Sequence, residues 1–260
     1  MDYFVDTKPY FSTAGSSHLP ALILIHGSTV TRTMWLPQLR GLAGYYHVIA
    51  PDLPGHGAFA HTHFTFVSAV KTIVDIIKQE AQGRALIVGL SLGGYVAIKL
   101  AENHPDLVAG MVLSGCSMNF TGVLGLYLKI ASQMMQLGWV KPSQRRTEQK
   151  VRQMFPAELS DVAEAQMKAG VYPQALSSSF AEMAGEDFMT SLAMYPGPIL
   201  ILNGERDTTC RRHEERFVSV MQKGQLQIIQ DAGHACNLDQ PEEFNRKLRI
   251  FGQSIERIPG

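Results

Sequence analysis

The sequence predicts an α/β fold: a mostly parallel sheet with helices on both faces and an inserted helical cap. Short apolar runs alternate along the chain with longer stretches in which apolar residues recur at helical spacing. This alternation is typical of parallel strands joined by crossover helices. In addition, the stretch 117–195 separates two predicted strands and is far longer than one crossover helix requires.

Each predicted strand is a short, nearly continuous apolar run, as expected for strands that are covered on both faces. Each predicted helix places apolar residues three and four positions apart. The strands are predicted near residues 20–26, 46–50, 85–89, 108–113, 198–203 and 225–230, with a less regular hairpin in residues 2–13. The helices are predicted near residues 34–43, 64–82, 92–103, 211–223 and 241–255.

The long stretch divides the chain into two predicted parts. Residues 1–116 and 196–260 form the core, and residues 117–195 form a helical cap, or lid. Most of the chain's 12 methionines lie in the cap, together with aromatic residues such as Phe120 and Trp139. Because methionine is unbranched and adaptable, a methionine-rich lid suits an apolar pocket, although periodic methionines can equally be helix-core residues.

Composition narrows the function classes. The chain has 23 basic and 23 acidic residues, so its formal net charge is zero. This gives no electrostatic reason to expect nucleic acid or an anionic membrane as a partner, and we expect a small-molecule substrate with no stable membrane association. The first residues lack the pattern of a signal peptide, and no apolar run approaches the ~18 residues of a membrane span, so a cytoplasmic location is expected.

The residues 87–94, with the sequence IVGLSLGG, are the most informative part of the chain. A strand-like run leads into G-x-S-x-G, and a helical pattern follows. Such a nucleophile elbow places the serine on a sharp turn between strand and helix, where only glycines at the flanking positions avoid a clash. Ser91 is therefore the predicted nucleophile.

A serine nucleophile needs a base, an acid and an oxyanion hole. The strand predicted near 225–230 is followed by His234, a candidate base, and the preceding strand is followed by carboxylates. The candidate acids are Glu205, Asp207 and Asp231. Near the N-terminus, another strand runs into His26-Gly27-Ser28, where the amide of Ser28 can join that of Leu92 to stabilise an oxyanion.

These motifs, in this order, resemble the α/β-hydrolase fold superfamily, of the small serine esterase and C–C hydrolase type. The resemblance covers nearly the whole chain and implies Ser91 as nucleophile, His234 as base, Asp207 as acid, and Ser28 and Leu92 as the oxyanion amides. One departure is Cys210, where relatives often have proline. The motifs are His26-Gly27, residues 52–57 (DLPGHG), the elbow at Ser91, Gly204 to Asp207, Gly233-His234 and residues 239–244 (DQPEEF).

The resemblance also narrows the reaction. Dehalogenases and epoxide hydrolases of this fold use aspartate at the elbow, and menaquinone-pathway relatives usually carry arginine where this chain has Tyr95. With Leu90 and Leu92 flanking Ser91, a carboxylic ester of a neutral, fairly hydrophobic acid is the favoured substrate. Two alternatives remain: a C–C bond hydrolase acting on a vinylogous diketone, and a ligand receptor on a hydrolase scaffold. Arg145, Arg146 and Arg152 are candidate carboxylate partners for the C–C hydrolase, although solvated positions suit them better.

No cofactor and no metal are expected, since a serine triad needs neither. His26 is predicted to be structural, and His56, His61 and His63 suit a metal only if another ligand joins them. Three widely spaced cysteines suit reduced thiols. Cys116 is expected to be an inert filler, whereas Cys236, two residues after His234, is expected to be partly exposed, so that a maleimide there slows the reaction.

Overall fold

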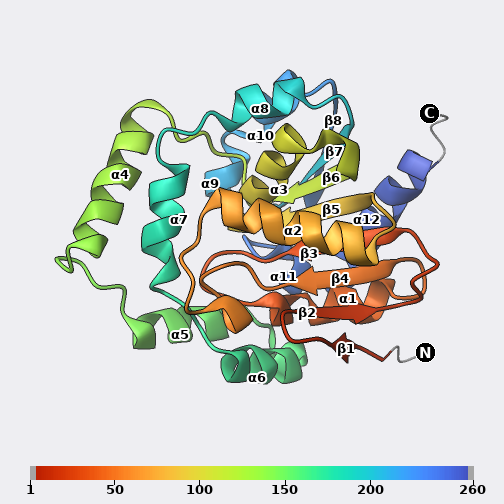
Figure 1. Cartoon of the computed structure of the whole chain (residues 1–260), viewed down its shortest axis with the longest axis horizontal. Coiled ribbons are helices and arrows are strands. Elements are labelled where there is room, and N and C mark those ends of the chain that lie inside the picture. Colours follow the sequence, from red (N-terminus) through yellow and green to blue (C-terminus); the bar gives the residue numbers. More distant parts are fainter. Residues whose placement is uncertain (1–3, 257–260) are drawn as a thin grey trace.

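The structure is a computed structural model that describes residues 4–256. Its sheet has eight strands in the order β1-β2-β4-β3-β5-β6-β7-β8 (Figure 1). All neighbours from β4 to β8 are parallel, and β2 is antiparallel to both β1 and β4. The strands are β1 (Asp6–Thr7), β2 (Phe11–Ala14), β3 (Ala21–Ile25), β4 (His47–Pro51), β5 (Ala85–Leu90), β6 (Val108–Ser114), β7 (Pro198–Gly204) and β8 (Lys223–Ile229).

The predicted α/β fold is confirmed, and each predicted strand is present within a few residues of its expected bounds. The N-terminal hairpin corresponds to β1 and β2, although residues 2 and 3 of that prediction lie outside the described residues. The helices are α1 (Leu36–Leu42), α2 (Phe66–Glu80), α3 (Leu92–Asn103), α4 (Gly122–Gln136), α5 (Gln144–Gln153), α6 (Ser160–Ala169), α7 (Ala175–Met183), α8 (Phe188–Met194), α9 (Thr208–Arg211), α10 (Glu214–Val220), α11 (Cys236–Asp239) and α12 (Pro241–Glu256).

Alternate residues of the central strands enter two separate cores, one on each face of the sheet. On β3, Ile23 and Ile25 pack into the core covered by α2 and α3, whereas Leu22 and Leu24 pack into the core covered by α1 and α12. This follows from the period of two along a strand. Because both faces are covered, the carboxyl ends of the parallel strands form the free edge where loops can build a site.

Residues 117–195 form the five helices α4 to α8 between β6 and β7. In this insertion α4 lies against α7 at one side of the molecule, and α8 lies against α3 (Figure 1). The methionines of the insertion have mixed surroundings: Met183 is buried in the core, whereas Met194 is 70% exposed. No helix within residues 4–256 has the length and apolar character needed to cross a membrane.

Candidate active site

Ser91 lies on a strained turn between β5 and α3. Its φ is 53° and its ψ is −117°, a region that a residue with a side chain rarely occupies, at a strain of about 1–3 kcal/mol. The backbone N–H of Ser91 donates to the carbonyl of Ser114 at the end of β6 (2.8 Å). The surrounding structure therefore holds the hydroxyl at the carboxyl edge of the sheet, at the N-terminus of α3.

Two backbone amides lie beside this serine. A Cβ on Gly27, in the loop after β3, would be 3.5 Å from the Cβ of Ser91, so this loop lies against the elbow. Within residues 4–256, the amide nitrogens of Ser28 and Leu92 donate no hydrogen bond to a protein acceptor. Leu92 is also the first residue of α3, where the helix dipole favours negative charge. Both amides are available for an oxyanion.

The structure brings together His234 and Asp207. Nδ1 of His234 lies 2.7 Å from Oδ2 of Asp207, and the other oxygen, Oδ1, accepts the backbone N–H of Cys210 (3.3 Å). Asp207 is buried, whereas the side chain of His234 is about half exposed. Burial opposes ionisation of Asp207, but the hydrogen bond and charge of His234 outweigh it, and the pKa of the carboxyl lies below its usual value.

Glu205 and Asp231, the competing acids, form no hydrogen bond or ion pair with His234 within residues 4–256. Oε2 of Glu205 accepts the backbone N–H of Asp231 (3.2 Å), and the carboxylate of Asp231 lies 3.8 Å from the guanidinium of Arg206. These interactions are on the surface and tie the loops after β7 and β8 together. Of the three candidate acids, only Asp207 is placed to orient the imidazole.

Ser91 and His234 both lie against the chain that leaves β6. The carbonyl of Ser114 accepts the amide of Ser91, and a Cβ on the next residue, Gly115 (φ 59°), would be 2.7 Å from Cε1 of His234. No hydrogen bond between Oγ of Ser91 and the imidazole is present within residues 4–256; such contacts often tighten only when substrate binds. Gly115 is required because a side chain there would displace the imidazole.

Sequence reasoning missed the polar group that holds Gly115. Asn203, fully buried near the end of β7, accepts the N–H of Gly115 through Oδ1 (2.9 Å). Its Nδ2 donates to the buried carboxylate of Glu214 (3.0 Å), which pairs with Arg211 (3.0 Å). The only sign of this role in the sequence was the amide side chain of Asn203 at the end of an apolar run. This network positions the backbone against which His234 packs.

His26 and His56 are structural, as was predicted for His26. Nδ1 of His26 lies 2.7 Å from the carbonyl oxygen of Gly27, and Nε2 accepts the N–H of Leu53 (3.0 Å). Nε2 of His56 accepts the N–H of Thr29 (3.2 Å). Burial lowers the pKa of His26 to about 4 and that of His56 to about 3. Both imidazoles are therefore neutral and fix the loop that carries Ser28.

These two histidines should make the protein lose stability in mild acid. The unfolded chain takes up protons below about pH 6.5, whereas folded His26 and His56 stay neutral until their own lower pKa values, so the free energy of unfolding should fall as pH drops below about 6.5. The slope expected from both groups approaches about 2.7 kcal/mol per pH unit below about pH 6, measured by urea unfolding between about pH 6 and about pH 5. His56→Gln should halve that slope. The same slope in His56→Gln as in the unchanged protein would contradict this assignment.

One cluster of the described residues has donor atoms within 4.8 Å of one another, formed by Asp207, Cys210 and His234. In this structure the carboxylate and the imidazole bind each other, and burial raises the pKa of the Cys210 thiol to about 12. The expectation that the site needs no metal stays a prediction.

The prediction for Cys236 is wrong. Its side chain is fully buried in the first turn of α11, where Sγ lies 3.3 Å from Oγ of Ser114. Burial raises the pKa of this thiol to about 12. Cys236 is only two residues from the half-exposed His234, but it is not exposed itself, because the chain turns inward at the start of α11. Cys116 is buried as expected, so maleimide should not reach either thiol in the folded protein.

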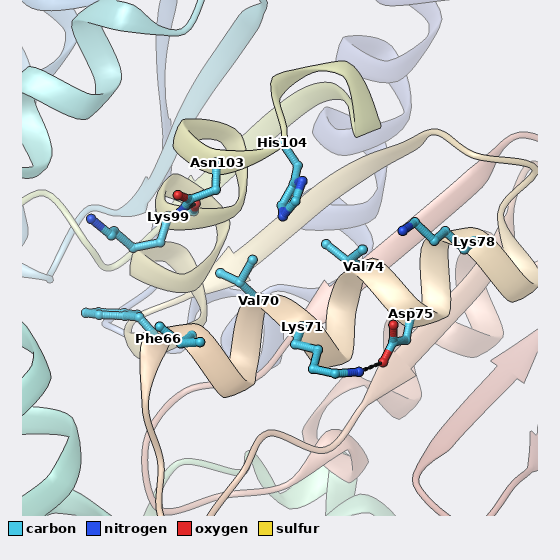
Figure 2. Close-up of a pocket in the computed structure, with 10 residues that line it drawn as sticks. Phe66, Val70, Lys71, Val74, Asp75, Lys78, Lys99, Asn103 and His104 are labelled. Atoms are coloured by element: carbon cyan, nitrogen blue, oxygen red, sulfur yellow. Dashed lines mark hydrogen bonds and ion pairs between the residues drawn. The ribbon is translucent and has the colours of Figure 1, made fainter.

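A surface pocket of about 530 Å³ lies between α2 and α3, away from this site (Figure 2). Val70 and Val74 form its floor, and several of its charges are already paired. Lys71 contacts Asp75 (2.5 Å), and Lys99 contacts the carboxylates of Glu102 and Glu186. None of the predicted site residues lines this pocket.

Comparison with known proteins supports the resemblance to α/β-hydrolases that the sequence motifs indicate. Residues 22–247 match the Alpha/beta hydrolase family. An AB hydrolase superfamily protein of Gibberella zeae is 36% identical over 122 residues, which cover 43% of each chain. The pimeloyl-[acyl-carrier protein] methyl ester esterase of Vibrio vulnificus is 25% identical and is aligned over 95% of this chain and 99% of its own length.

Among solved structures, a thermophilic esterase from Thermogutta terrifontis superposes with a TM-score of 0.77. It is 21% identical, and the match covers 98% of both chains. The likeness extends over the sheet and the insertion alike, so it concerns the whole fold. The family match spans most of the chain, from β3 into α12. The chain therefore belongs to the alpha/beta hydrolase family.

Proposed function

We propose that this protein is a serine hydrolase that cleaves carboxylic esters of fairly hydrophobic substrates through an acyl-enzyme. The observation that carries the proposal is the hydrogen bond between Asp207 and His234 (2.7 Å) beside a serine held on a strained elbow. Strain of this kind persists only where the surrounding structure maintains it, and it clusters at active sites. The esterase activity of the Vibrio vulnificus relative agrees with this chemistry.

In the proposed reaction, Oγ of Ser91 attacks the ester carbonyl while Nε2 of His234 accepts its proton. Asp207 binds the Nδ1–H of the imidazole, which leaves Nε2 free as the base and stabilises the imidazolium that forms. The amides of Ser28 and Leu92 receive the oxyanion of the tetrahedral intermediate. His234 then protonates the leaving alcohol, and water, activated by the same imidazole, releases the acid and regenerates Ser91.

The positions of four side chains favour ester hydrolysis over the alternative C–C hydrolase reaction. The proposed carboxylate partners Arg145, Arg146 and Arg152 are exposed on α5. The hydroxyl of Tyr95, at the position where relatives with acidic substrates have arginine, accepts the N–H of Met118 (3.3 Å) and is buried. With these groups on the surface or already bonded, a neutral substrate fits better than one that carries a carboxylate.

The insertion is proposed to act as the cap over the site. Oγ of Ser28 donates to Oγ of Ser179 on α7 (3.4 Å), which links the oxyanion loop directly to the insertion. The ring of Tyr95 packs against those of Phe120 and Phe188, so the start and the end of the insertion are both fixed on α3. A lid attached in this way can select among acyl groups.

A phosphonate ester probe tests the proposed nucleophile directly. The probe should label the folded protein once, and mass spectrometry of the digest should place the adduct on the peptide that contains Ser91. His234→Ala should label far more slowly, because the hydroxyl loses its base. Denatured protein should not react. Labelling at another serine, or equal labelling before and after denaturation, would contradict the proposal.

A further inference from the structure

Exposed apolar side chains are concentrated on one short part of the insertion. Val123 is 87% exposed and Trp139 is 75% exposed, and five other large apolar residues between positions 123 and 140 are about half exposed or more. Scattered single apolar residues are normal on a protein surface, but a contiguous group marks a binding site. The group consists of Val123, Leu126, Tyr127, Ile130, Leu137, Trp139 and Val140.

The helix that carries most of this group is apolar on two opposite sides. The side of α4 that includes Gly125, Leu128 and Ser132 is buried, and the carbonyl of Ser132 accepts the hydroxyl of Ser177 on α7 (3.3 Å). The other side faces solvent and carries the exposed apolar residues at helical spacing. Apolar residues on two sides of a helix need cover on both sides. Because α4 lies at the outer edge of the molecule (Figure 1), its exposed side has no cover from the described residues.

Positive charge borders the apolar group. The exposed basic residues Lys129, Lys141, Arg145, Arg146, Lys150 and Arg152 lie on α4, on α5 and in the connection between these helices. Glu148 is the only acidic residue between positions 117 and 156. None of these cations forms an ion pair with another residue of the described range 4–256. The neutral charge of the whole chain therefore conceals a strongly basic surface on the insertion.

We propose that this surface, which we call the 123–152 surface, docks on an anionic phospholipid bilayer. The apolar residues of α4 enter the boundary between headgroups and acyl chains, and the basic residues bind the anionic headgroups. Trp139 and Tyr127 are residue types that prefer this boundary, since each combines an apolar ring with a polar group. The arrangement corresponds to interfacial binding by one helix face, without any membrane-spanning segment.

The geometry favours a bilayer over a protein partner. A twofold dimer through this surface would bring two sets of unpaired cations together, which is repulsive. The exposed side of α4 lies at the outer edge of the molecule, where a broad surface can reach it. Binding of lipid should therefore require anionic headgroups and should weaken as salt screens them.

Tryptophan fluorescence provides the first test, because the chain has two tryptophans and the other one, Trp35, is fully buried. On addition of phosphatidylcholine vesicles that contain phosphatidylglycerol, the emission of Trp139 should shift to the blue, and the protein should co-sediment with the vesicles. Vesicles of phosphatidylcholine alone should have little effect, and high salt should reverse the binding. The readout does not depend on the proposed esterase activity.

Two double variants, each with a control elsewhere on the protein, test whether the 123–152 surface binds the vesicles. Leu126→Ser with Ile130→Ser, and separately Arg145→Gln with Arg146→Gln, should each weaken vesicle binding on the order of tenfold or more. The controls change exposed residues elsewhere: Val67→Ser on α2, and Arg212→Gln with Arg216→Gln, should bind as the unchanged protein does. Absence of binding to anionic vesicles overturns the proposal, as does equal loss in variants and controls. A dimer in solution that the Leu126 and Ile130 changes dissociate would assign the surface to a second copy and also overturn it.

Discussion

Ser91→Ala should lower kcat/KM for ester hydrolysis by several orders of magnitude, about 10⁴-fold to 10⁶-fold, without changing the fold. The hydroxyl is the only group that the elbow presents for covalent attack, and its removal leaves the oxyanion amides of Ser28 and Leu92 to act on water alone. His234→Ala should have a similar effect. Steady-state hydrolysis of p-nitrophenyl esters, with circular dichroism as the check on folding, measures both.

The double variant that combines Ser91→Ala with His234→Ala tests whether the two residues act in the same step. Because Ser91 and His234 act as one unit, removing both should cost about as much as removing either alone. Independent contributions would instead multiply. A double variant that falls far below both single variants would show that His234 serves another step, and full activity in folded Ser91→Ala would refute the proposed mechanism.

Asp207→Asn should be strongly impaired, by roughly 10⁴-fold, because the amide can no longer hold the imidazole in the productive tautomer. Glu205→Gln is the matched control, since Glu205 lies in the same loop but contacts the backbone of Asp231 instead of His234. It should retain nearly full activity. Loss of activity in Glu205→Gln with a functional Asp207→Asn would reverse the assignment of the acid.

The fold could be predicted because its signals are local. The strands are short apolar runs, and α2 begins at a capping box in which Thr65 and Ser68 bind each other's backbone. The acid that pairs with His234 was harder to identify, because Glu205, Asp207 and Asp231 all follow the carboxyl ends of two adjacent strands, β7 and β8. Only the positions of the loops after β7 and β8 in space separate them, and the motif resemblance supplied that information in advance.

Burial of polar groups and thiols could not be predicted in this way. Asn203 is far from Gly115 in sequence, and the hydrogen bond between them exists only because β6 and β7 are neighbours in the sheet. Glu214, which accepts the amide of Asn203, joins this network only through that residue. Cys236 was placed beside His234 by sequence distance, whereas the direction of a side chain depends on the turn that carries it. The exposed apolar side of α4 could not be predicted either. Periodicity identifies an apolar helix, but it does not tell which side of that helix the rest of the protein covers.

Gly93→Ala should destabilise the protein by about 3 kcal/mol or more. A Cβ at this position would be 2.1 Å from the carbonyl oxygen of Ile25 and 2.7 Å from that of His26. These atoms belong to the backbone of a central strand and the residue after it, so neither can move without disturbing the sheet or the elbow.

The sign of the change in unfolding free energy shows whether the backbone clash or the higher helix propensity of alanine dominates at Gly93. Gly93 is the second residue of α3, and in an open helix replacing glycine with alanine stabilises by about 1 kcal/mol. Here the close approach of α3 to β3 outweighs that gain. The midpoint of urea unfolding should fall accordingly, and failure of the variant to accumulate as folded protein is the extreme form of the same result.

Gly27→Ala is the control for Gly93→Ala, because it adds the same methyl group in the same region. A Cβ on Gly27 would be 3.5 Å from its nearest neighbours, which is ordinary van der Waals contact, so the unfolding free energy should change by less than about 1 kcal/mol. If both variants were equally stable, the helix would have room at Gly93, and the tight contact that fixes the strained turn of Ser91 would be absent. Loss of stability at Gly93 alone would show that the elbow is held by backbone contact between α3 and β3.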